Sequence, residues 1–164
     1  MTCDLCDTVG GKLLWQDAHL RVVYIDEPGY SGYCRVIWKS HVAEMTDLDE
    51  GSRAHCMHVV FSVEALLREL LKPDKINLAS LGNFTPHVHW HVIARFRDDP
   101  HFPQSSWGTR QRETLAPVAP GLPQRLSQAL AARLHTKSRK IYDPSVNYYR
   151  FPLSFPLKCD LLHS

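Results

Sequence analysis

Alternating apolar and polar positions in the first hundred residues predict five β-strands. Each candidate strand is a short run rich in β-branched and aromatic residues between turn-forming residues, which is the pattern typical of strands. Gly10-Gly11 precedes the first run, and the loop DEPGYSG separates the second run from the third. We expect strands at residues 12–16, 20–25, 33–39, 75–81 and 87–96.

A different period between the third and fourth runs predicts one long helix. From residue 56 to residue 70 the apolar positions recur every three or four residues, as they do along one face of a helix. Asp47, followed three residues later by Glu50, resembles a capping box and is expected to begin this helix, and Pro73 is expected to end it. Three strands, a helix and two strands favour an α+β fold, in which an antiparallel sheet of about five strands packs with one long helix.

The pattern changes after residue 108, and we therefore expect a first domain over residues 1–108 and a C-terminal extension over 109–164. Residues 97–108 have no periodicity and are interpreted as a loop. Leucines at positions 122, 126, 130 and 134 recur at four-residue spacing and predict a short helix over 121–134. The tail at 141–164 is rich in proline and aromatic residues, a composition that leaves open whether it wraps around the domain, meets a partner or lacks order.

Composition and charge narrow the function classes. The chain has 164 residues and a formal net charge of +2, too small to indicate bulk nucleic-acid binding, so no sequence-specific nucleic-acid partner is expected. No run of 18 apolar residues predicts a membrane span, and the polar N-terminus lacks a secretory pattern, so a cytoplasmic protein is expected. The five cysteines favour reduced thiols or a metal site over a disulfide framework.

Three histidines carry the most specific chemical signal. His87, His89 and His91 alternate with Val88 and Trp90, so on a strand the three imidazoles would share one face at intervals of roughly 7 Å. A neutral imidazole, with an ordinary pKa near 6.5, is a nucleophile at pH 7 and can attack a phosphoryl centre. The same row could instead bind a metal, and the spacing leaves both alternatives open.

The stretch HVHWHVI resembles the signature of the histidine triad (HIT) superfamily. Further similarity is found, in the same order as in that family, in Cys3-x-x-Cys6, the DEPG loop, VIWKSHVAEMTDL at 36–48 and Gly82-Asn83. The resemblance extends over residues 3–108, roughly two-thirds of the chain. It implies a HIT-like fold and a symmetric homodimer.

The resemblance also implies nucleotidyl chemistry that requires no cofactor. His89 would attack the α-phosphate of a nucleoside phosphoramidate or a dinucleoside polyphosphate and form a nucleotidyl-histidine. The main-chain carbonyl of His87 would hold the Nδ1 proton of His89, and His91 would steady the phosphate oxygens. Three further residues would contact the substrate or support the site: Asp26 at the ribose, Asn77 at the active-site backbone or the phosphate, and Asn83 near the phosphate or the leaving group.

Two positions depart from the family pattern. Many HIT enzymes have a fourth histidine where this chain has Tyr33, which is not cationic at pH 7. Phe84 replaces a small polar residue that could donate a proton to a leaving amine. Trp107 lies where HIT proteins often close the site of a neighbouring subunit, although ordinary packing is an alternative. Arg95 and Arg97 either attract phosphates or are solvated charges.

A structural zinc site is implied by the same resemblance. Some bacterial-type HIT proteins combine such a CxxC with two histidines, which here correspond to His41 and His87. Cys3, Cys6, His41 and His87 would then form a closed Cys2His2 site, with free thiols as the alternative.

Three functions therefore remain in competition. The first is a HIT hydrolase or transferase acting through covalent His89. The second is a metal-dependent hydrolase that uses the histidine row as metal ligands. The third is a nucleotide-binding HIT protein with little turnover.

Overall fold

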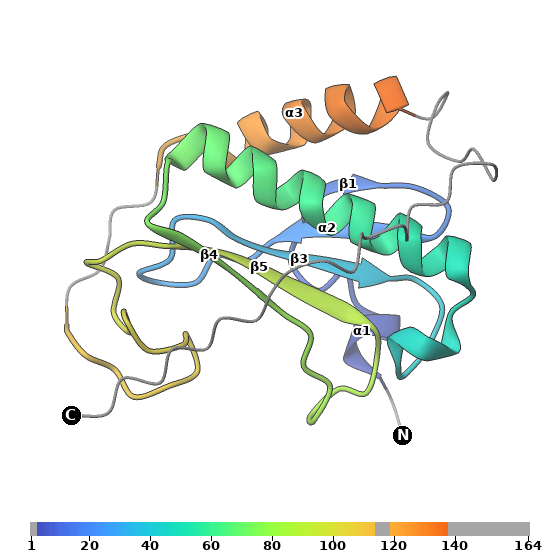
Figure 1. The fold of residues 1–164 in the computed structure, drawn as a ribbon, viewed down its shortest axis with the longest axis horizontal. Helices are drawn as coiled ribbons and strands as arrows, with labels where there is room; N and C mark the ends of the chain where they lie inside the picture. Colours follow the sequence, from blue (N-terminus) through green and yellow to red (C-terminus); the bar gives the residue numbers. More distant parts are fainter. Residues whose placement is uncertain (1–2, 114–118, 138–164) are drawn as a thin grey trace, which may run out of the picture.

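Five antiparallel strands form one sheet in the order β1-β2-β3-β5-β4 (Figure 1). The computed structural model describes residues 3–113 and 119–137, with side chains up to His135. All five predicted strands are confirmed, most of them slightly shorter than expected. Their bounds are Lys12–Gln16 for β1, Leu20–Tyr24 for β2, Tyr33–Trp38 for β3, Lys75–Ala79 for β4 and His89–Arg95 for β5.

The long helix α2 spans Glu50–Leu71, but the predicted N-cap was wrong by two residues. Asp49 is the cap, and its carboxylate accepts a hydrogen bond from the Ser52 amide at 2.8 Å. Asp47 lies instead in the 3-10 turn η1, Met45–Asp47, where its carboxylate accepts the Glu44 amide at 3.4 Å. Two aspartates at this spacing both satisfy a capping pattern, and only the path of the chain selects one of them.

The end of α2 agrees with the prediction. Leu71 is its last residue, and Lys72 adopts a left-handed conformation with φ of 51°. Proline disfavours the helical conformation in the residue before it. Pro73 therefore turns the chain out of the helix and toward β4.

Helices α2 and α3, Leu122–Lys137, cover the same face of the sheet (Figure 1). One hydrophobic core joins this face to both helices, and Val88, Trp90 and Val92 all pack in it, as the alternation predicts. Helix α3 packs against α2 and β1. Its four periodic leucines are buried in the same core: Leu122, Leu126, Leu130 and Leu134. The tail at 141–164 lies outside the described residues.

In the part of the chain that the structure describes, the opposite face of the sheet is covered only in part. The short helix α1, Asp4–Asp7, places Leu5 against Val23 and Ile37. The Arg21 guanidinium holds α1 in place by donating to the carbonyl oxygens of Leu5, at 2.6 Å, and Thr8, at 3.0 Å. The sequence analysis did not predict α1, because four residues are too few to show a helical period.

Among the helices of residues 3–113 and 119–137, none has both the length and the apolar composition that a membrane span requires.

Candidate active site

The partly covered face of the sheet contains a pocket of about 410 Å³ over β3 and β5. His89 and His91 project into it because both belong to the odd-numbered positions of β5, whereas the even-numbered positions face the helices. Asn83, one of the predicted substrate contacts, also lines it. The other lining residues are Asp4, Leu5, Arg35, Leu81, Phe84, Thr85 and Trp107.

His89 is oriented by the main chain. The Nδ1–H group of His89 donates to the carbonyl oxygen of His87 at 2.6 Å, which leaves the Nε2 lone pair of the neutral ring free. Burial lowers the pKa of His89, although the hydrogen bond to His87 acts in the opposite direction. Because its ordinary pKa is already near 6.5, His89 is neutral at pH 7 and therefore nucleophilic.

His91 is held between two aromatic side chains. Its Nδ1 lies 2.8 Å from the Tyr33 hydroxyl, and its ring lies nearly perpendicular to that of Trp107, at an interplanar angle of 78° and a centroid distance of 4.9 Å. Burial lowers the pKa of His91 to about 3. When the Tyr33 hydroxyl donates to Nδ1, the proton of neutral His91 is on Nε2, where it can be donated to a ligand oxygen. Trp107 thus contacts the site of its own chain.

His87 does not join the other two imidazoles, contrary to the expected row of three. The residue precedes β5, and its amide donates to the Thr85 carbonyl in a turn. Its ring is 1% exposed and its Nε2–H donates to the Trp38 carbonyl at 2.6 Å. The strand was predicted to begin two residues before the start of β5. Val88 still packs in the helix-facing core as the alternation predicts, but of the three histidines only His89 and His91 line the pocket.

The ring of His87 instead belongs to a cluster with Cys3, Cys6 and His41. Their four ligand atoms all lie within 4.8 Å of one another. Nδ1 of His87 is 3.4 Å from Sγ of Cys3 and 3.5 Å from Sγ of Cys6, and Nδ1 of His41 is 3.4 Å from Sγ of Cys6. These separations fit a tetrahedral zinc site, in which bonds of about 2.0–2.3 Å place ligand atoms roughly 3.5 Å apart.

The tautomer of His87 also fits a metal. Because its Nε2–H is used by the Trp38 carbonyl, the neutral ring presents the Nδ1 lone pair to the two sulfur atoms. Metal-bound histidines commonly fix their second nitrogen by such a bond to a carbonyl. The predicted set of Cys3, Cys6, His41 and His87 is therefore brought together with the donor geometry of a Cys2His2 zinc site.

The loop after β5 is anchored by a buried ion pair. The Arg95 guanidinium donates to the Asp99 carboxylate at 2.6 and 2.9 Å, and to Oδ1 of Asn77 at 2.6 Å. Arg95 is 2% exposed, so it is neither a solvated charge nor part of the pocket lining. Arg97 is exposed and pairs with Asp74. This anchoring fixes the start of the loop that brings Trp107 to His91.

Two of the predicted substrate contacts lie apart from the pocket lining. Asn77 is on β4 and is bonded to Arg95. Asp26 is exposed, two residues after the end of β2. Arg35 and Thr85 line the pocket and were not among the predicted site residues. Arg35 could have been found from its position, since it alternates with Tyr33 and Ile37 along a predicted strand.

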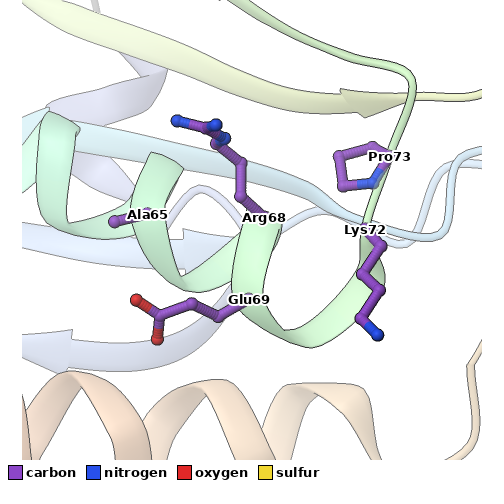
Figure 2. A pocket seen from close by; sticks show the side chains of 5 residues that line it. All are labelled: Ala65, Arg68, Glu69, Lys72 and Pro73. Carbon is purple, nitrogen blue, oxygen red and sulfur yellow. The ribbon is translucent and has the colours of Figure 1, made fainter.

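A second hollow of about 410 Å³ lies at the C-terminal end of α2 (Figure 2). Ala65, Arg68, Glu69, Lys72 and Pro73 line it, without a histidine or cysteine among them. The Glu69 carboxylate accepts two hydrogen bonds from Arg133 of α3, at 2.7 and 2.9 Å. These described contacts of the hollow connect α2 to α3, and they do not indicate a reaction.

Solved structures show the same fold. A histidine triad protein from Bradyrhizobium japonicum is 28% identical, with a TM-score of 0.60 over 74% of this chain and 90% of that one. A zinc-bound histidine triad family protein from Mycobacterium smegmatis is 23% identical, with a TM-score of 0.57 over 83% and 97%. A hypothetical histidine triad nucleotide-binding protein from Sulfolobus tokodaii is 21% identical, with a TM-score of 0.55 over 86% and 97%.

No curated protein matches the chain by sequence, whereas one family model does match it. The family model of the HIT domain matches residues 9–98, just over half of the 164 residues. This match includes all five strands, α2 and the three histidines. The chain therefore belongs to the HIT domain family, within a superfamily of nucleotide-binding proteins and hydrolases.

Proposed function

We propose that this protein is a nucleotidyl hydrolase or transferase whose nucleophile is His89. The observation that carries the proposal is the 2.6 Å hydrogen bond from Nδ1 of His89 to the His87 carbonyl, made at the wall of the pocket. This bond fixes the tautomer in which Nε2 has the free electron pair. A main-chain carbonyl also stabilises the positive charge that the ring acquires when Nε2 forms a bond.

The first step forms a covalent nucleotidyl-histidine. The Nε2 lone pair attacks the α-phosphorus of a nucleoside phosphoramidate or dinucleoside polyphosphate, and a P–N bond forms. The bond from phosphorus to the leaving nitrogen or oxygen breaks, and the leaving group takes its electron pair and a proton from solvent. Water then attacks the phosphorus, the P–N electron pair returns to Nε2, and the proton of that water is released with the nucleoside monophosphate.

The surrounding residues have distinct roles in this proposal. The Nε2–H group of His91 donates to a phosphate oxygen, and Asn83 contacts the phosphate or the leaving group from the pocket wall. Asn77 supports the active-site loop through Arg95. Asp26, in the loop after β2, binds the ribose.

The position of the cysteine–histidine cluster favours covalent catalysis by His89 over a mechanism in which the histidine row binds a catalytic metal. Within the part of the chain that the structure describes, the group with metal-ligand spacing contains His87 but neither His89 nor His91. We infer that this cluster binds a structural zinc ion, which would supply no step of the reaction. The zinc-bound relative from Mycobacterium smegmatis supports this inference.

A covalent-labelling experiment tests the nucleophile. Substrates labelled at the α-phosphate are mixed with wild type, His89→Ala and His135→Ala, quenched and mapped. His135 is exposed on α3 and serves as a matched histidine control. We expect label on His89 in wild type and in the control, and turnover reduced by at least about a thousandfold in His89→Ala.

Two results would overturn the proposal. Equal hydrolysis by wild type and His89→Ala would exclude His89 as the nucleophile. Nucleotide binding without any release of monophosphate would favour the third function, a nucleotide-binding protein with little turnover, as in the name of the Sulfolobus tokodaii relative.

We further propose that the protein forms a homodimer in the cytoplasm. The proposal extends to this chain the symmetric dimers that HIT domains usually form. Light scattering on the purified full-length chain tests it directly. A mass equal to that of one chain across the micromolar range would contradict the dimer.

A further inference from the structure

Arg35 lies at the centre of the candidate active site. It is in the middle of β3, where it is paired in register with His91 of β5. It shares the odd-numbered positions of β3 with Tyr33 and Ile37, and it lines the same pocket as His89 and His91. A cation is therefore built into the floor of the pocket, on a strand rather than on a movable loop.

No carboxylate in the described part of the chain neutralises the charge of Arg35. Among the described residues, no Asp or Glu oxygen lies within 4.0 Å of its guanidinium, although Asp4 also lines the pocket. Its Nε–H is buried without a hydrogen-bond acceptor among the described residues. The guanidinium lies 5.9 Å from the centroid of the Tyr33 ring, and it opposes the rise that burial causes in the pKa of the Tyr33 hydroxyl. Arg95, on the same face, shows the opposite arrangement, because Asp99 pairs with it.

A buried donor without an acceptor costs free energy, so its retention in a pocket points to a ligand that supplies the acceptor. Guanidinium groups match the planar, bidentate geometry of phosphate oxygens. The positive charge of Arg35 also acts on the rings of His89 and His91. After burial, which is the largest cause, the positive charge of Arg35 helps to lower the pKa of His89 and of His91.

We propose that Arg35 is the cation that binds the non-bridging oxygens of the substrate phosphate attacked by His89. This inference rests on the proposed function and names the group that neutralises the charge developing on those oxygens. Arg35 forms and breaks no covalent bond and stays protonated throughout. It supplies the positive charge that Tyr33, at the position of the fourth histidine in many HIT enzymes, does not.

A binding experiment that needs no turnover tests Arg35 separately from the nucleophile. The four nucleoside 5′-monophosphates and the matching nucleosides are titrated by calorimetry into wild type, Arg35→Met and Arg35→Lys. Methionine keeps an unbranched apolar side chain of similar reach, and lysine keeps the charge without the bidentate geometry. We expect wild type to bind its preferred monophosphate at least about tenfold more tightly than the nucleoside.

Arg35→Met should lose this preference while binding the nucleoside as wild type does, and Arg35→Lys should keep part of it. Equal nucleoside affinity in all three proteins would show that the pocket has kept its shape. In the same proteins, kcat/KM should fall about a hundredfold in Arg35→Met. If wild type does not distinguish monophosphate from nucleoside, or if Arg35→Met keeps the full preference, Arg35 does not bind phosphate.

The two proposals can fail independently. A protein that labels His89 but keeps its phosphate preference in Arg35→Met would refute only the role of Arg35. A protein that loses this preference in Arg35→Met but never labels His89 would refute only the covalent mechanism.

Discussion

Single residues with several hydrogen bonds fix the turns on which the strands depend. Asp17, in the tight turn between β1 and β2, accepts the amides of His19 and Leu20 at 2.8 and 2.9 Å. Its carboxylate also lies 2.7 Å from Nε2 of His55 on α2, so one side chain links the hairpin to the helix. Burial raises the pKa of Asp17, but these hydrogen bonds outweigh it and the net pKa is lowered from 3.8.

The first prediction concerns the ionised form of Asp17. A folded-state pKa below the ordinary value contributes stability that is fully present above about pH 4 and is lost as the pH falls through the lowered pKa. We expect Asp17→Asn to reduce the free energy of unfolding by about 1 kcal/mol at pH 7. Urea unfolding between pH 3 and pH 7 measures the difference, with exposed Asp26→Asn as the control. A difference that does not shrink as the pH falls from 4 to 3 would contradict the lowered pKa of Asp17.

At the scale of residues, the sequence predicted which side chains meet better than how each of them is oriented. The position of His89 in the pocket and the cysteine–histidine set could be inferred from motifs, because those motifs specify which side chains meet. Strand alternation alone would place the ring of His87 in the pocket, and only the family resemblance indicated the cluster with Cys3, Cys6 and His41 in which the structure places it. Nor could the ion pair of Arg95 be inferred, since Asp99 lies in a loop without periodicity.

At the scale of elements, the existence and type of the five strands and of α2 and α3 followed from periodicity, whereas α1 and most of the element ends did not. Both the start of α2 and the start of β5 were displaced by two residues. Periodicity specifies a repeating face, whereas an end depends on which cap or turn competes best. Helix α3 was predicted as part of an extension, yet the structure places its leucines in the main core.

The second prediction tests how strongly α3 belongs to that core. Leu126 is fully buried, and Leu126→Ala should reduce the free energy of unfolding by about 2–5 kcal/mol, because it leaves a cavity among residues of α2 and the sheet. Exposed Gln128→Ala, on the same helix, should change it by less than about 0.5 kcal/mol. Chemical unfolding followed by tryptophan fluorescence reports on the sheet. An unchanged midpoint in Leu126→Ala would show that α3 contributes nothing to sheet stability.

At the scale of the whole molecule, the cluster of Cys3, Cys6, His41 and His87 joins three distant parts of the chain. It connects α1, the segment after β3 and the turn before β5. These segments are separated by as many as 84 positions in sequence. A metal at this point would therefore close long loops and stabilise the face of the sheet on which the pocket lies.

The third prediction concerns removal of that metal. Protein purified with zinc should hold one equivalent, and Cys6→Ser should hold much less and melt at least about 5 °C lower. Buried Cys56→Ala provides a matched control, because Cys56 packs in the core away from the cluster and its loss should leave the zinc content unchanged. Metal analysis and thermal melting give both values. Zinc-free wild type, with the same melting temperature as Cys6→Ser, would exclude the site.

His87 has two separate roles: its side chain belongs to the cysteine–histidine cluster, and its main-chain carbonyl accepts a hydrogen bond from His89. This has a consequence for how mutants of this protein are interpreted. The acceptor that aligns the ring of His89 is the main-chain oxygen of His87, and no substitution of a side chain can remove it. A substitution of His87 removes one member of the cysteine–histidine cluster. It leaves the orientation of the His89 ring intact as long as the main chain of residue 87 does not move. Loss of turnover in such a variant would therefore measure how strongly the N-terminal segment holds the main chain of His87 in position. It would give no information on acid–base chemistry by the imidazole of His87.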